Sequence, residues 1–245
     1  MPTNPTAVSP EPVATGAREI GPIAILLGVA VLTLGFGLLA EEVMEGDTKA
    51  FDAHVAGLFR VAGASSPIGP PWLQEMARDV TSLGSFALLG FVLAIVVGYL
   101  LLIRKRSAAV LMGASVLGGV LLSTVLKMGF DRPRPDISDT VRVFTASFPS
   151  GHATLSAITY LTLGALMTRV EAHRRVKAYV ISVAVFLTLI VGLSRLYLGV
   201  HYATDVLAGW CVGSAWALLC WSVAYWLQRR GQIERPSTTA AGVQR

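Results

Sequence analysis

The sequence predicts an all-α integral membrane protein, a bundle of six transmembrane helices. Hydrophobic residues make up 53% of the chain and charged residues only 14%, whereas a soluble domain carries about 25% charged residues. Long apolar runs also recur along the chain, and roughly 20 apolar residues are enough for a helix to cross the hydrocarbon of a bilayer. Both observations place the chain among membrane proteins.

The predicted spans follow from the position and length of these runs. Four long uncharged runs are 20–40, 80–103, 107–126 and 206–228. The shorter runs 153–168 and 178–194 are included because His152 and Arg195, just outside them, have the character of functional groups at the edge of a bundle. A signal peptide is the alternative for the first run, but signal peptides have apolar cores of about 7–15 residues behind a basic stretch.

The segments outside the spans are two tails and one long loop. Residues 1–19 are rich in Pro, Thr, Ala and Ser and predict a disordered tail, and residues 229–245 form a second tail. Apolar residues at helical spacing in the outer loop 41–79 predict an amphipathic helix at the membrane interface. These residues are Phe51, Val55, Leu58 and Phe59. The spans therefore form one domain, 20–228.

The basic residues predict the orientation of the bundle. The formal net charge is +5, but most basic residues lie in short loops and tails between or after spans, so they do not indicate a nucleic-acid surface. They are Arg104, Lys105, Arg106, Arg169, Arg174, Arg175, Lys177, Arg229, Arg230 and Arg235. The positive-inside rule makes these segments and both termini cytoplasmic in a plasma (inner) membrane. The loops after the first, third and fifth spans then face the periplasmic or extracellular side.

The first polar cluster is KMGFDRPRP, residues 127–135, at the outer end of the third span. Lys127, Arg132 and Arg134 are cations in an outer loop, against the preferred sign. One interpretation is contact with lipid headgroups by side chains that snorkel. The other is a phosphate clamp, since an Arg fork grips two phosphate oxygens and a Lys adds a mobile charge.

The second cluster is FPSGHAT, residues 148–154, where the fourth span begins. Ser150 is a favourable N-cap residue, and the first backbone N–H groups of the helix create an anion-binding site. His152 lies on that first turn. The alternative is an ordinary helix start without a functional role.

The third cluster is SRLYLGVHYATD, residues 194–205, with Arg195 in the last turn of the fifth span. On a helix, His201 and Asp205 are only about 40° apart around the axis. Asp205 then accepts a hydrogen bond from one ring nitrogen and leaves the other as a base or nucleophile. Interfacial polar groups and a metal site are alternatives, but a site this cationic favours an anion over a divalent cation.

Together, the three segments resemble the signature of the type 2 phosphatidic acid phosphatase superfamily: KxxxxxxRP, PSGH and SRxxxxxHxxxD. The chain has the three motifs at 127–135, 149–152 and 194–205, in the same order and with the same internal spacing. The motifs cover residues 127–205, and the six-span pattern extends the resemblance over about 20–228. The tails and the loop 41–79 lie outside it. The superfamily also includes soluble vanadate-dependent haloperoxidases, and six spans argue against that branch.

The resemblance implies a role for each matching residue. Those that would bind phosphate are Lys127, Arg134, Ser150, Gly151 and Arg195. His201 would attack phosphorus and form a phosphohistidine, and Asp205 would orient it. His152 would protonate the departing lipid hydroxyl as a general acid. No metal ion or organic cofactor is implied.

These expectations predict a metal-independent phosphatase of membrane lipids. Its substrate class is a lipid phosphate or diphosphate, such as phosphatidate, phosphatidylglycerol phosphate or a polyprenyl diphosphate of the undecaprenyl type. A lipid phosphotransferase with the same intermediate is the alternative, and a non-catalytic lipid-phosphate transporter is less favoured because binding alone needs no nucleophile. We expect membrane lipids as partners, no nucleic acid and no required protein. The sequence assigns no role to Arg132 or Arg142.

Overall fold

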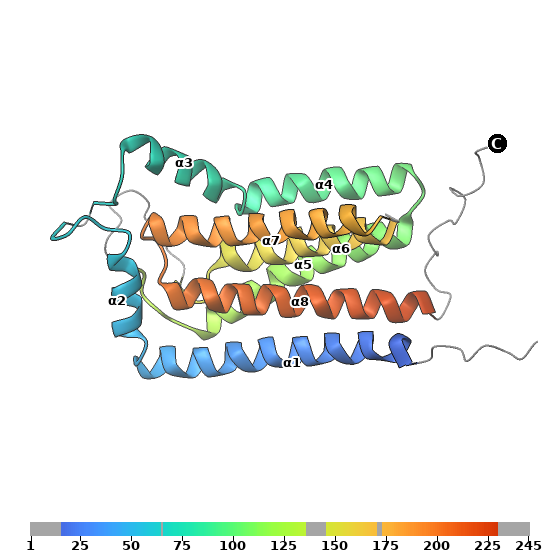
Figure 1. Cartoon of the computed structure of the whole chain (residues 1–245), viewed down its shortest axis with the longest axis horizontal. Helices are drawn as coiled ribbons and strands as arrows, with labels where there is room; N and C mark the ends of the chain where they lie inside the picture. The colour runs from blue at the N-terminus through green and yellow to red at the C-terminus, as the bar shows by residue number, and fades with distance from the viewer. Residues whose placement is uncertain (1–15, 65, 136–145, 171–172, 230–245) are drawn as a thin grey trace, which may run out of the picture.

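The computed structural model describes residues 16–64, 66–135, 146–170 and 173–229, and their regular structure is entirely α-helical (Figure 1). Isolated backbone pairing between Arg60 and Pro67 is the exception. The helices are α1 (Gly16–Glu45), α2 (Lys49–Gly57), α3 (Pro71–Ser82), α4 (Phe86–Leu102), α5 (Arg106–Gly129), α6 (Gly151–Val170), α7 (Arg174–Tyr197) and α8 (Ala203–Arg229). The prediction of an all-α fold is confirmed for these residues.

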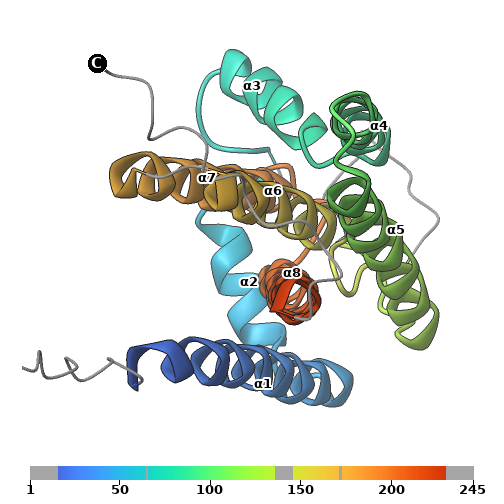
Figure 2. The ribbon, with the colours of Figure 1, turned by 90° about the vertical axis from the view of Figure 1, so that its right-hand side faces the viewer.

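The long helices lie side by side along one axis, and the short ones cover one end of the bundle. In Figure 1, α1 and α4 to α8 run along the long axis, while α2 lies across the end where α3 also sits. The described chain begins and ends at the opposite end. Figure 2 shows α8 between α1 and the pair formed by α6 and α7.

The core lies where α6 and α8 pack against each other, and this contact depends on small residues. A Cβ atom added to Gly213 would lie 2.6 Å from the carbonyl oxygen of Thr154, and one added to Gly209 would lie 2.8 Å from that of Ser150. Glycine at these two positions of α8 therefore lets the two helices approach closely. Because Ser150 precedes α6 directly, the same contact fixes the start of α6.

Length and apolar composition do not confirm six transmembrane helices. Within the described residues, four helices meet these criteria, namely α1 over Ile23–Glu45, α5, α7, and α8 over Ala203–Leu227; α3 and α4 meet them together, as a pair bent by 46°. The fourth predicted span, 153–168, forms α6, which is not among them. Its buried face carries hydroxyl side chains, namely Thr154, Ser156, Thr159 and Thr162. Packing against α4, α5, α7 and α8 shields α6, so its sequence is less apolar than that of a lipid-facing helix.

The boundaries of two other predicted segments also change. The predicted span 80–103 is interrupted after Ser82, and Ser85 begins α4 by accepting a hydrogen bond from the N–H of Leu88 at 3.2 Å. Residues 16–19 belong to α1 rather than to the tail, and α1 continues to Glu45. Both predicted boundaries differ from the structure because they rest on apolar runs alone. A capping residue inside such a run does not interrupt it, and a polar helix end lies outside it.

The long loop 41–79 contains the expected short helix and an additional one. The helix α2 is present, with exposed Phe51 on it and exposed Leu58 just after it. Asp52, on the same helix, is only 2% exposed. The second helix of the loop, α3, was not predicted. This loop thus contributes a buried carboxylate at the end of the bundle.

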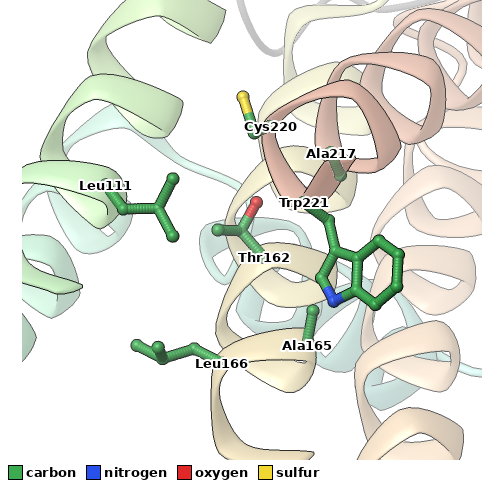
Figure 3. A pocket seen from close by; sticks show the side chains of 7 residues that line it. All are labelled: Leu111, Thr162, Ala165, Leu166, Ala217, Cys220 and Trp221. Atoms are coloured by element: carbon green, nitrogen blue, oxygen red, sulfur yellow. The ribbon is translucent and has the colours of Figure 1, made fainter. Parts of the chain in front are cut away.

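A small pocket lies in the half of the bundle away from α2 and α3. A pocket of about 10 Å³ lies between α5, α6 and α8, and Figure 3 shows its lining side chains, among them Thr162, Cys220 and Trp221. This volume corresponds to a single water molecule. This pocket is therefore too small to hold a substrate.

Candidate active site

The three sequence motifs meet at the end of the bundle that α2 and α3 cover. Lys127 lies in the last turn of α5 and Arg195 in the last turn of α7, while the second motif precedes and opens α6. Three phenylalanines bring the first two motifs together: the ring of Phe148 lies 5.0 Å from that of Phe130 and 5.9 Å from that of Phe36. The aromatic contacts therefore position both motif segments against α1.

A histidine and an aspartate form the centre of the site. The Nδ1 atom of His201 lies 3.3 Å from Oδ2 of Asp205, and Nε2 lies 3.1 Å from Nη1 of Arg134. His201 precedes α8, which begins at Ala203, so the expectation that both residues share one helix is wrong. They meet because Asp205, in the first turn of α8, also accepts the N–H of Tyr202 at 2.9 Å.

The protonation state of His201 follows from its surroundings. Burial lowers the pKa of His201 to about 4, and the cations of Arg195 and Arg134 act in the same direction. The carboxylate of Asp205 opposes this shift. The ring is therefore neutral at pH 7. With its proton on Nδ1 toward Asp205, the unprotonated Nε2 accepts a hydrogen bond from Nη1 of Arg134.

Asp205 is fully buried, and its oxygens are occupied. Oδ1 accepts a hydrogen bond from Nη1 of Arg132 at 2.6 Å. Oδ2 accepts the hydroxyl of Ser147 in a short hydrogen bond, in addition to the two contacts just described. Ser147 was missed by the sequence analysis, although it lies only three residues before Ser150. The carboxylate consequently has one fixed orientation toward His201.

Three cations lie on the other side of His201, and neutral oxygens hold them. Nζ of Lys127 donates to the carbonyl of Ala146 at 2.9 Å, Nη1 of Arg134 to that of Val200 at 3.0 Å, and Nη1 of Arg195 to the hydroxyl of Thr81 at 3.0 Å. Electrostatic repulsion links Lys127 to both arginines. Burial lowers the pKa of Arg134. An anion in this region would relieve the repulsion.

The start of α6 adds unpaired donors to the cations. The Oγ atom of Ser150 and Nε of Arg195 are buried and have no hydrogen-bond partner among the residues that the structure describes. A Cβ atom added to Gly151 would lie 3.3 Å from Cε of Lys127, so the lysine reaches the helix N-terminus. Buried donors without acceptors are costly, and an anion would satisfy them.

His152 and Arg132 complete the description of the predicted residues. His152, on the first turn of α6, interacts electrostatically with all three cations and with His201. Arg132 is different from the other cations of its motif, because Asp52 and Asp205 occupy its guanidinium. It is therefore not a free phosphate-binding group. Arg142 lies outside the described residues.

The eight predicted site residues thus lie at one end of the bundle, and the structure adds further residues to them. The additions are Asp52, Thr81, Ser147 and Thr204. A polar residue inside the apolar run FDAHVAGLF was a usable signal for Asp52. Nothing in the sequence pointed to Thr81 or Thr204. Within the described part of the chain, no cluster of three or more His, Cys, Asp or Glu side chains is placed to hold a metal ion.

Comparison with known proteins identifies relatives of this fold and site. Residues 108–229 match the PAP2 superfamily. Phosphatidylglycerophosphatase B of Bacillus subtilis is 33% identical over 157 residues, which cover 62% of this chain and 76% of that protein. Decaprenylphosphoryl-5-phosphoribose phosphatase of Mycobacterium tuberculosis is 29% identical over 173 residues, 69% of this chain and 90% of the relative.

A solved structure extends the similarity to the three-dimensional fold. The crystal structure of a transmembrane PAP2 type phosphatidylglycerolphosphate phosphatase from Bacillus subtilis superposes with a TM-score of 0.73 at 29% sequence identity. The superposition covers 82% of this chain and 98% of that one. The similarity therefore includes the helices outside the motif segments.

Proposed function

The chain belongs to the PAP2 superfamily and is an integral membrane protein, and from the geometry of its site we propose that it hydrolyses a lipid phosphate or diphosphate through a phosphohistidine intermediate. The observation that carries this proposal is the position of His201. Its unprotonated nitrogen, Nε2, accepts a hydrogen bond from Arg134, and its other nitrogen is held by the buried carboxylate of Asp205. A neutral imidazole between a fixed carboxylate and a group of cations is suited to attack an anionic phosphorus centre.

Substrate binding uses the cations and the start of α6. Lys127, Arg134 and Arg195 neutralise the phosphate, and the buried hydroxyl of Ser150 and the N–H of Gly151 donate to its oxygens. These groups are fixed before substrate arrives, so little reorganisation is needed as charge redistributes in the transition state. The buried, unpaired Oγ of Ser150 and Nε of Arg195 support this assignment.

The reaction has two steps. In the first, Nε2 of His201 forms a bond to phosphorus while the bond to the lipid oxygen breaks, and His152 donates its proton to that oxygen. In the second, water attacks phosphorus, the nitrogen–phosphorus bond breaks, and His152 takes a proton from the water. Asp205 stabilises the positive charge that the ring of His201 carries in between. The products are the dephosphorylated lipid and inorganic phosphate.

The substrate is a lipid whose phosphate reaches the end of the bundle while its tails stay in the bilayer. The named relatives act on a phosphatidylglycerol phosphate and on a polyprenyl-linked phosphoribose. Both combine a phosphate with long hydrocarbon chains. We therefore assign this chain the same class, which includes phosphatidate and polyprenyl diphosphates.

The site faces the periplasmic or extracellular side in this proposal. Arg104, Lys105 and Arg106 lie where α4 joins α5, at the end of the bundle opposite the site (Figure 1), and the positive-inside rule makes that end cytoplasmic. With α6 as a further crossing helix, the bundle has the six spans expected from the sequence. α6 has 20 residues, enough to cross the hydrocarbon region.

The test is a phosphate-release assay on purified protein with phosphatidylglycerol phosphate in detergent micelles and water as the acceptor. His201→Ala should abolish release, whereas His54→Ala, at an exposed position on α2, should leave it unchanged. Release should also persist in excess EDTA, because no step uses a metal ion. Wild-type protein that releases little free phosphate, but moves phosphate to an added alcohol, would establish the transferase instead.

A further inference from the structure

One buried carboxylate of the outer loop is tied directly to the start of α8. Asp52 accepts the backbone N–H of Thr204 at 3.0 Å and the hydroxyl of Thr204 at 2.8 Å. It also pairs with Nη2 of Arg132 at 2.7 Å. Asp52 is 2% exposed on a helix whose neighbouring positions Phe51 and Ala53 face outward. This contact therefore joins α2 to the residue that precedes Asp205.

Arg132 extends the contact to the centre of the site. Its Nη1 atom donates to Oδ1 of Asp205 at 2.6 Å and to the hydroxyl of Thr204 at 2.8 Å, while Nη2 binds Asp52. The guanidinium carbon also lies 4.3 Å from the centroid of the Tyr202 ring. Four contacts thus fix one planar group between two carboxylates. A guanidinium held in this way cannot turn toward a substrate phosphate.

The charges of Asp52, Arg132 and Asp205 matter for the reaction. Two carboxylates and one guanidinium leave a net negative charge next to His201. If Asp52 were neutral, Arg132 would pair with Asp205 alone, and the charge of that pair would cancel. The ring of His201 becomes positive when it carries the phosphoryl group, so it needs the charge of Asp205 most in the intermediate. In a buried site this effect is larger than in water.

We propose that Asp52 is a positioning residue for the phosphatase reaction. It holds Arg132 in place and balances its positive charge, so that Arg132 does not cancel the negative charge that Asp205 presents to His201. This inference rests on the proposed function. Asp52 acts through Arg132 and Asp205 and does not touch the substrate, whereas the phosphate is bound by other cations. Its removal should therefore affect the chemical step more than substrate binding.

The first variant to measure is Asp52→Asn, with Asp47→Asn as the matched control. Asp47 is an exposed carboxylate of the same loop. We expect kcat of Asp52→Asn to fall by about 10²-fold, the size of effect that a displaced catalytic group produces, with KM within about threefold of wild type. The control should match wild type in both constants. A fall in kcat of Asp52→Asn no larger than that of the control would overturn the proposal.

The double variant Asp52→Asn/Arg132→Gln separates charge balance from a purely structural role. Removing both charged partners avoids an unpaired buried charge, and the amide of glutamine can still donate to Asp205. We expect kcat to recover by about 10-fold relative to Asp52→Asn, a coupling typical of residues in one network. A structural role predicts a double variant no more active than Asp52→Asn, and that result would contradict the inference.

The same assay distinguishes failure of the inference from failure of the proposed function. Wild-type protein that releases no phosphate from lipid phosphates overturns the phosphatase proposal and this inference with it. Active wild-type protein, with Asp52→Asn equal to Asp47→Asn, overturns the inference alone. Size-exclusion chromatography and thermal unfolding show whether Asp52→Asn folds. If it does not fold, the double variant decides, and it should fold and retain at least about a tenth of wild-type kcat. Lower activity of the double variant contradicts the proposal.

Discussion

The two sides of the pair formed by His201 and Asp205 differ in how their cations are balanced. On one side, Arg132 is held between two carboxylates. On the other, Lys127, Arg134 and Arg195 are held by neutral oxygens. A guanidinium paired with two carboxylates is suited to fixing a catalytic group, and cations that donate to neutral oxygens are suited to attracting an anion. Two arginines only two residues apart in one motif thus have different expected roles.

The largest difference between the two sides should appear on truncating Arg134. Arg134→Ala removes a group next to Nε2 of His201 to which we assign phosphate binding. We expect kcat/KM to fall by about 10²–10³-fold, as for loss of one donor to a developing charge. Inorganic phosphate should also become a weaker competitive inhibitor. The measurement is steady-state phosphate release in detergent micelles, with phosphate added as inhibitor.

The matched variant on the other side is Arg132→Gln. Here the inhibition constant for phosphate should stay within about threefold of wild type, because Arg132 does not bind the phosphate. An equal loss of phosphate affinity in both arginine variants would show that the two sides do not differ as proposed.

A smaller effect is expected from the residue that positions Arg195. Thr81→Val removes the hydroxyl that accepts Nη1 of Arg195 at 3.0 Å but keeps the shape of the side chain. We expect KM to rise by about 3- to 10-fold, the cost of about one hydrogen bond to a charged group, with little change in kcat. Thr81→Ser should restore KM, since it returns the hydroxyl. A KM that rises equally in both variants would argue against this contact.

These comparisons also show what the sequence could and could not predict. Motif spacing predicted that Lys127, His201 and the other motif residues belong to one site, and the structure places them at one end of the bundle. Asp52 and Thr81 could not be located in this way, since their contacts depend on where α2 and α3 dock. Hydropathy missed the bend between α3 and α4, because the run from 80 to 103 carries no charged residue.

The predicted number of spans is instructive for the same reason. A lipid-facing helix such as α1 exposes Leu26, Leu27 and Val31, and its apolar composition is evident. α6 lies inside the bundle and carries buried hydroxyl groups, such as the pair formed by Thr162 and Ser115 at 3.1 Å. Composition alone therefore identifies lipid-facing helices better than the helix at the core, which is also the helix that opens at the site.

The smallest expected change concerns the protonation state of His201. It depends on the carboxylate of Asp205 on one side of the ring and on the cations on the other. Since burial and the cations lower its pKa to about 4, the neutral form persists as pH falls from 8 to 5 and is lost only below that range. NMR spectra of protein with ¹⁵N-labelled histidine should therefore show an unchanged His201 ring over this interval, with His201→Ala identifying its signals. Titration near pH 6.5 would mean that Asp205 outweighs burial and the cations.

The most direct test of the central claim is to look for the phosphoryl group on His201 itself. Lipid phosphate labelled with ³²P is mixed with wild-type protein and with His201→Ala, the reaction is stopped within the first turnover in alkaline detergent, and the peptides are separated and sequenced by mass spectrometry. The account predicts label on the peptide that contains His201 and none in the variant. Hydrolysis by the wild type with no labelled peptide, together with hydrolysis that persists in His201→Ala, would contradict it.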